Sequence, residues 1–292
     1  MSSTTTAPNA RATAAPRPHS ARPSIAAIYG WELRKLRAQK RTYLGLGSAI
    51  VIPVIFVVSL MLQSGDVNDV PFGRYVRQTG LAIPPVLLLF SSIWLLPLIV
   101  SLVAGDIVAN EDGNGTLKTI LTRSVDRHQI WLAKMLAAFT YAALALVLFA
   151  GVGLLLGGLR YGFHPLTSLS GTRIGVGRAL ALMGASLLAY MMPLLALASI
   201  ALLLSTVTRN SAAAVVGALM ASLIMQLLGV ISGLDFLKPY LLSTQFDAWQ
   251  GLLREPADWA PIVRSAWVSA CYGIPALLIG LTNFVRRDVT GG

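Results

Sequence analysis

Residues 105–134 read GDIVANEDGNGTLKTILTRSVDRHQIWLAK, and this charged, polar segment lies between two long apolar runs. The runs occupy residues 81–104 and 130–159. Each is long enough to cross a bilayer, because a membrane-spanning helix needs about 20 apolar residues. A loop this polar between two spans indicates a docking surface. The segment therefore predicts a helical membrane fold and a place where a partner binds.

The composition of the chain is that of an integral membrane protein. Of its 292 residues, 55% are hydrophobic and 12% are charged, whereas soluble domains carry about 25% charged residues. The apolar runs are too long and too uniform for the strands of a transmembrane barrel. We therefore predict an all-α integral membrane fold with six transmembrane helices, at residues 43–62, 81–104, 130–159, 179–204, 212–231 and 265–284. Prolines within these spans predict kinks at Pro53, Pro97, Pro193 and Pro275.

Lys and Arg residues flank the apolar runs, so the formal net charge of +11 indicates membrane orientation rather than nucleic-acid binding. With a cytoplasmic N-terminus, the inner segments hold 15 of the 23 Lys and Arg residues. Cytoplasmic loops carry such an excess, and we therefore expect both termini in the cytoplasm. The single cysteine, Cys271, lies in an apolar run, which excludes a disulfide framework.

The N-terminal residues 1–24 are mostly Ala, Ser, Thr, Pro and Arg without an apolar core, which predicts a disordered cytoplasmic tail. We expect the membrane domain at residues 25–288 and a C-terminal tail at residues 289–292. Residues 234–264 form the longest segment on the predicted outer side. Its helical spacing of apolar residues predicts amphipathic helices with Tyr and Trp at the headgroup level, and they either cap the bundle or act as a lid over an exit path.

An interfacial helix is predicted from Ser24, which can cap it, through Arg41. Apolar residues recur at helical spacing on one face, and basic residues crowd the following turns. This pattern is typical of a helix lying on an anionic leaflet, and its candidate residues are Trp31, Glu32, Arg34, Lys35 and Arg37. Glu32 falls on the apolar face, where it either pairs with Lys35 three residues on or contacts a partner. Deeper in the chain, Lys134 lies near a span end, from which its long side chain can reach the interface.

The central loop contains a glycine-rich turn, Gly113-Asn114-Gly115, directly after the acidic residues Glu111 and Asp112. Thr116 can then cap a short cytoplasmic helix between spans two and three, with Leu117, Ile120 and Leu121 on one face. Such a helix either fills a groove on a partner or lies on its own bundle.

At these residues the chain resembles the type-2 ABC exporter permeases, the membrane subunits of ATP-driven exporters. The resemblance extends from about residue 25 to residue 288, and the chain departs from the family pattern at Ser124, where the family usually has proline. The basic helix at residues 31–41 and the ending FVRRD at residues 284–288 are also similar to the family. The matching loop positions are Glu111, Gly115, Thr116, Leu117, Lys118, Ile120, Leu121, Val125, Arg127 and Lys134.

The resemblance implies a six-span subunit that pairs with a second copy or a paralogue in a bacterial inner membrane. It also implies a cytoplasmic ABC ATPase subunit at each inner face, with the loop of spans two and three as its coupling helix. The matching loop residues would then be ATPase-docking residues. This chain contains no GxxxxGK[ST] phosphate loop, so ATP and Mg would be bound by the partner chain. We predict no cofactor, no metal site and no catalytic residues in this chain.

Transport of an amphiphilic or hydrophobic substrate, such as a lipid, drug or peptide, is the function that the resemblance implies. The alternative is a membrane scaffold or sensor subunit of an ABC complex that does not transport. A stand-alone ion-coupled carrier is disfavoured, because no acidic or basic residue lies deep in a predicted span, whereas such carriers need intramembrane ionisable groups.

Overall fold

The structure is a computed structural model, and it describes residues 24–63, 71–113, 115 and 126–286. The first part of the chain forms α1 (Ile25–Ala38), α2 (Lys40–Leu62), η1 (Gly73–Tyr75), η2 (Gly80–Ala82), α3 (Ile83–Ser91), α4 (Leu95–Ala104), α5 (Ala109–Gly113) and α7 (Arg127–Tyr161). The second part forms β1 (Leu166–Thr167), β2 (Arg173–Ile174), α8 (Val176–Thr208), α9 (Ser211–Val230), η3 (Lys238–Tyr240), α10 (Leu242–Gln245), η4 (Ala248–Leu253) and α11 (Ala260–Val285).

The helical membrane fold that the composition predicts is confirmed. Within the described ranges, five helices are long and apolar enough to cross a membrane: α2, α7, α8, α9 and α11. A sixth span is present only if the η2–α3 segment and α4 are counted together. Four of the five helices extend several residues beyond the apolar runs from which they were predicted, since polar residues continue the helical hydrogen bonding at the span ends.

The predicted second span, residues 81–104, is wrong as a single helix. Its two halves, η2–α3 and α4, are bent by 65° relative to each other. Pro97 lies in the first turn of α4, where a missing N–H breaks no helical hydrogen bond. A continuous helix would press the proline ring against the carbonyl of Ile93, four residues earlier. The chain therefore breaks at residues 92–94, one turn before the proline at which the sequence predicts a kink.

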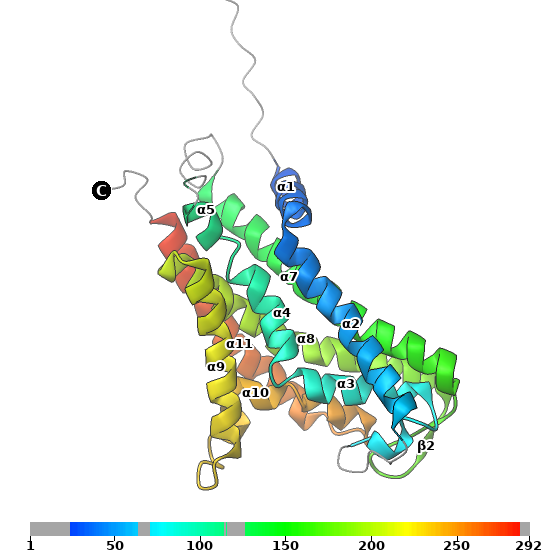
Figure 1. Cartoon of the computed structure of the whole chain (residues 1–292). Coiled ribbons are helices and arrows are strands. Elements are labelled where there is room, and N and C mark those ends of the chain that lie inside the picture. Colours follow the sequence, from blue (N-terminus) through cyan, green and yellow to red (C-terminus); the bar gives the residue numbers. More distant parts are fainter. Residues whose placement is uncertain (1–23, 64–70, 114, 116–125, 287–292) are drawn as a thin grey trace, which may run out of the picture.

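The helices form a bundle around α8, which packs against α4, α7, α9 and α11. Figure 1 shows α1, α5 and the C-terminal end of α11 at one end of the bundle, and α3, α10 and β2 at the other. We call the first the α1 end and the second the hairpin end, after the antiparallel pair β1–β2. The first and last described helices reach the same end, as an even number of spans requires. The prediction that this end is cytoplasmic is not tested by the fold.

Close helix contact at the hairpin end depends on glycine. Gly80 donates its backbone N–H to the carbonyl of Gly162 at 2.9 Å. A Cβ added at Gly80 would come within 2.5 Å of the carbonyl oxygen of Gly157 in α7. Two backbones therefore touch here without an intervening side chain, which is how small residues allow close helix packing in membranes.

The segment after α9 does not form the amphipathic helices that its sequence predicts. It forms only the short elements η3, α10 and η4, and Phe246, Trp249 and Leu252 are buried in the core. The ring of Phe246 lies 5.0 Å from the ring of Tyr190 in α8. Trp249 does not face outward, because its part of the segment folds inward against α8 and α11, whereas Tyr240 and Trp259 of the same segment are exposed. This packing supports a cap rather than a lid.

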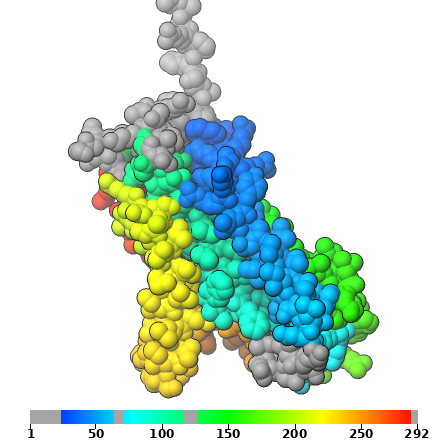
Figure 2. All heavy atoms as spheres, in the orientation of Figure 1, coloured from blue at the N-terminus to red at the C-terminus, as the bar shows by residue number. Residues whose placement is uncertain are grey.

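Helix α9 is the least covered of the long helices. It stands out from the bundle in the space-filling view, where it forms the yellow column of Figure 2. An apolar stripe runs along its exposed face and consists of Val216, Met220, Ile224 and Leu227. These positions recur every three or four residues, so they share one face of the helix.

Candidate functional site: an ion ring beside the polar loop

The docking residues predicted in the polar loop are only partly described by the structure. Thr116, Leu117, Lys118, Ile120 and Leu121 lie outside the described residues. Gly115 is exposed and adopts a positive φ of 70°, a backbone conformation that glycine adopts without a steric penalty. The glycine-rich turn that the sequence predicts therefore ends α5. The structure places the remaining predicted residues on the helices that border the loop.

Four of these residues form a closed ring of alternating charges, which we call the ion ring. Lys134 of α7 contacts Glu32 of α1 at 3.1 Å and Glu111 of α5 at 2.7 Å. Lys35 of α1 contacts the same two carboxylates, Glu32 at 3.0 Å and Glu111 at 2.7 Å. The ammonium group of Lys134 also donates to the backbone carbonyl of Ile107 at 3.1 Å. Three helices are joined by this ring.

The side chains of the ion ring are buried to different extents. The side chain of Lys134 is 0% exposed and that of Glu32 is 3% exposed, whereas Lys35 is 25% exposed. Burial alone raises the pKa of Glu111, but the charges of Lys134 and Lys35 outweigh it and hold that pKa below its usual range. Burial likewise lowers the pKa of Lys35, and Glu111 and Glu32 reverse this, so its pKa is raised. Both shifts keep Glu111 and Lys35 charged near neutral pH.

A second polar contact joins the turn between α4 and α5 to two other helices. The buried carboxylate of Asp106 forms an ion pair with Arg41 of α2 and accepts a hydrogen bond from the hydroxyl of Ser211 in α9. Burial raises the pKa of Asp106, and the contacts with Ser211 and Arg41 oppose that rise. This contact holds the start of the loop against the beginnings of α2 and α9.

Two further contacts fix the helix ends on either side of the loop. The hydroxyl of Ser205 in α8 accepts hydrogen bonds from the backbone amides of Val108 and Ala109, at 3.2 and 2.9 Å. It thereby satisfies N–H groups at the start of α5, which have no partner within that helix. On the other side, Arg127 at the start of α7 donates to the carbonyl of Val285 at the end of α11, at 2.7 Å.

The structure brings together four of the predicted site residues and leaves others apart. Glu32 pairs with Lys35, as the simpler interpretation predicted, and also with Lys134. The expectation that Lys134 reaches the interface is wrong, because its ammonium group is held inside the ion ring. Arg34, Arg37 and Trp31 are exposed on α1, and the ammonium of Lys35 lies 4.4 Å from the ring of Trp31.

Sequence reasoning missed Arg41, Ser205 and Ser211 as partners of the loop. Their contacts with Asp106, Val108 and Ala109 join residues at least 65 positions apart, and no local pattern signals them. Asp106 carried one signal, since it is an acid directly at the end of an apolar run. Such a carboxylate beside the membrane needs a partner.

The arrangement joins the helices around the polar loop to one another. In the part of the chain that the structure describes, no three His, Cys, Asp or Glu side chains could hold a metal ion together. The ion ring contains two acids and two bases with matched charges, and its groups are occupied with one another. What the ring does is fix α5 and α7, the elements on either side of residues 116–125.

A comparison with known families identifies the family of the chain. Residues 30–231 match the model of a family described as ABC-2 family transporter protein. The match covers more than half of the chain, from α1 to the end of α9, and includes the ion ring and the polar loop. No curated protein matches the chain.

Proposed function

Because the chain belongs to the ABC-2 family of transporter proteins, we propose that it is the permease subunit of an ATP-driven exporter. In this proposal a separate cytoplasmic ATPase docks on the polar loop at residues 113–127. A second copy or a paralogue completes the path. The substrate would be an amphiphilic or hydrophobic molecule that leaves the cytoplasm or the inner leaflet.

The observation that carries the proposal is the way in which both borders of the loop are tied to the bundle. The ion ring ties α5 to α1 and α7, and Ser205 ties α5 to α8. Asp106 ties the preceding turn to α2 and α9, and Arg127 ties α7 to α11. A displacement of the loop by a docked ATPase would therefore reach all five long helices. A loop that only joined two spans would not need these contacts.

The ATPase partner would supply the energy, because the sequence contains no phosphate loop of the GxxxxGK[ST] type. ATP and Mg would be held in that partner. On this chain, Leu117, Ile120 and Leu121 would fill a groove of the ATPase. Fully burying a Leu or Ile side chain stabilises an interface by about 1.5–3 kcal/mol.

The second permease would complete the transport path. The exposed stripe of α9, which includes Met220 and Ile224, suits contact with another apolar helix surface. In a bilayer such contact depends on close packing, since lipid tails are as apolar as the helix. This part of the proposal predicts cross-links between copies, or between paralogues, along α9.

The proposal is tested by reconstituting the chain with its co-purified ATPase in liposomes. We expect candidate substrates to stimulate ATP hydrolysis and to move across the membrane, and the chain alone to hydrolyse no ATP. Hydrolysis that no substrate stimulates, together with the absence of transport, would contradict the exporter function.

A further inference from the structure

Helix α9 leaves the bundle along its second half. Its buried residues are Ala214, Ala218 and Ser222, so no residue from Leu223 to Val230 is buried. Among the five long helices of the described chain, α9 has the smallest buried share. The second half of α9 therefore presents most of its side chains to the membrane.

A polar residue, Gln226, lies in this uncovered half. Its side chain is half-buried, and its amide forms no hydrogen bond within the described part of the protein. Side chains of a helix lean toward its N-terminus, which for α9 is at the α1 end, so the amide points away from the nearer membrane surface at the hairpin end. An unpaired amide is costly in a bilayer, because no water is present to replace the missing partner. Gln226 therefore needs a partner that this part of the chain does not supply.

Gln226 belongs to a row of residues that recurs at alternating intervals of three and four positions. We call this row the α9 seam, and it consists of Val216, Leu219, Leu223, Gln226 and Val230. Such spacing is the pattern of a left-handed coiled coil, which is also the geometry in which most membrane helices cross. Val216 and Val230 are 54% and 75% exposed, and neither leucine belongs to the hydrophobic core. The seam shares Val216 with the exposed stripe and runs along its edge.

The chemistry of an amide favours a second copy of the same residue as its partner. An amide both donates and accepts hydrogen bonds, so two glutamines satisfy each other. Two copies of one membrane protein insert in the same direction, and a two-fold axis between them brings each residue near the axis to its own counterpart. A lysine or an aspartate at such a position would face a like charge. One polar residue in an otherwise apolar seam also fixes the register of the paired helices.

We propose that a second copy of this chain docks along the α9 seam. The amide nitrogen of Gln226 in each copy donates to the amide oxygen of Gln226 in the other, and the leucines and valines of the seam pack around this pair. The inference rests on the proposed function, which requires a second permease, and it specifies a copy rather than a paralogue. A paralogue would need an amide of its own at the matching position.

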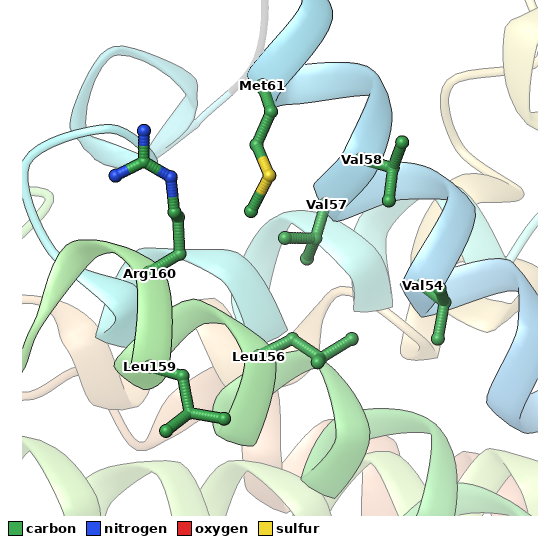
Figure 3. A pocket seen from close by; sticks show the side chains of 7 residues that line it. All are labelled: Val54, Val57, Val58, Met61, Leu156, Leu159 and Arg160. Carbon is green, nitrogen blue, oxygen red and sulfur yellow. The ribbon is translucent and has the colours of Figure 1, made fainter.

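A second apolar surface, between α2 and α7, provides a comparison without an amide. Figure 3 shows Val54 and Val57 of α2 facing Leu156 of α7 around a cavity of about 250 Å³. The described residues that line it are apolar except Arg160, and one of them, Val58, is 45% exposed. An arginine that faced its own counterpart would repel it, so copies of the chain should not pair through this surface.

Disulfide cross-linking in native membranes tests the geometry, on a Cys271→Ser background with Gln226 intact. Leu223→Cys should link to its counterpart under mild oxidation, whereas Ile224→Cys and Val58→Cys should not. Ile224 is the matched control, because it is 55% exposed and follows Leu223 directly but lies about 100° around the helix. Random collision would favour the more exposed Ile224, so equal cross-linking at the two positions would overturn the seam.

Förster transfer between copies labelled at Ser170→Cys, on the same background, gives the affinity in phosphatidylcholine liposomes without an ATPase. Gln226→Leu should weaken association about three- to thirtyfold, which is the range that hydrogen bonds between membrane helices contribute. Gln226→Asn should weaken it less, because the amide remains. Ser222→Ala, one turn away on the buried side of α9, should change the affinity by less than about twofold.

The stability of the dilute protein in dodecyl maltoside shows that the variant is folded. Gln226→Leu should leave the Tm unchanged or raise it, since the amide has no partner in a single copy. Equal association of wild type and Gln226→Leu would overturn the amide pair and leave the second permease of the proposed function in place. A wild-type chain that does not associate with itself at any protein-to-lipid ratio would overturn the docking of a second copy, whereas the docking of an ATPase on the polar loop is decided by its own pull-down.

Discussion

Replacing Lys134 by methionine should destabilise the protein more than any exposed charge substitution. Lys134 is 0% exposed, contacts Glu32 and Glu111 at 3.1 and 2.7 Å, and donates to the carbonyl of Ile107. Methionine preserves most of the apolar stem and removes the charge. The two carboxylates then face each other with only Lys35 between them.

The expected loss follows from the burial of the carboxylates. Removing one partner of a buried ion pair costs about 3–5 kcal/mol, because the remaining charge stays buried without compensation. Lys35 still contacts both carboxylates, so we expect the lower end, about 3 kcal/mol. The additional substitution Glu32→Gln removes the excess negative charge and should restore part of the loss, since contacting residues show interaction energies of about 0.5–3 kcal/mol.

The assay is reversible unfolding in mixed micelles of dodecyl maltoside and sodium dodecyl sulfate, followed by tryptophan fluorescence. The matched control is Arg178→Gln, which removes an ion pair with Glu255 at the hairpin end. The charged groups of Arg178 and Glu255 lie 2.9 Å apart, a distance similar to those in the ion ring, but Arg178 is 66% exposed. Loss of this pair should therefore cost less than about 1 kcal/mol. A Lys134→Met variant as stable as Arg178→Gln would refute the ion ring as a structural element.

The remaining predictions concern packing, orientation and docking. Gly80→Ala should destabilise the protein in the same unfolding assay, because its Cβ would overlap the backbone of Gly157. The control Gly30→Ala should stabilise α1 by up to about 1 kcal/mol, since a Cβ at Gly30 would meet no atom within 4 Å. Equal effects of the two substitutions would contradict the close helix contact. On a Cys271→Ser background, a membrane-impermeant maleimide should label Ser170→Cys from outside intact cells and leave Asn210→Cys unlabelled, and the reverse pattern would overturn the predicted orientation. Leu117→Ala with Leu121→Ala should reduce recovery of the ATPase in a pull-down at equal membrane expression, since each truncation removes up to about 3 kcal/mol of apolar burial. Wild-type recovery would mean that the short helix does not dock.

The long helices could be predicted from the sequence because apolar length alone determines them. The runs that became α2, α7, α8, α9 and α11 each reach the length of about 20 residues that a membrane-spanning helix needs. The break between α3 and α4 was not predictable to the residue, since a proline is tolerated within α2 at Pro53 and in the first turn of α4 at Pro97. Neighbouring helices decide between these outcomes.

The candidate site was predicted in part. The loop motif and the basic residues of α1 identified all four members of the ion ring, because each lies within a local pattern. Their mutual contacts could not be derived, since Glu32 and Lys134 are 102 positions apart in the sequence. The burial of Lys134 was missed for the same reason, because a lysine near a span end reaches the interface unless an acid from another helix meets it.

The most direct test of the coupling proposal places a photoreactive amino acid at Leu121 in the native membrane. After irradiation and purification, mass spectrometry identifies the proteins linked to it, and the same residue at Ser170 serves as the control at the opposite end of the bundle. We predict that Leu121 links this chain to a protein with a GxxxxGK[ST] phosphate loop and that Ser170 does not. Recovery of no such ATPase from Leu121, or its equal recovery from Ser170, would contradict the docking of an ATPase on this loop.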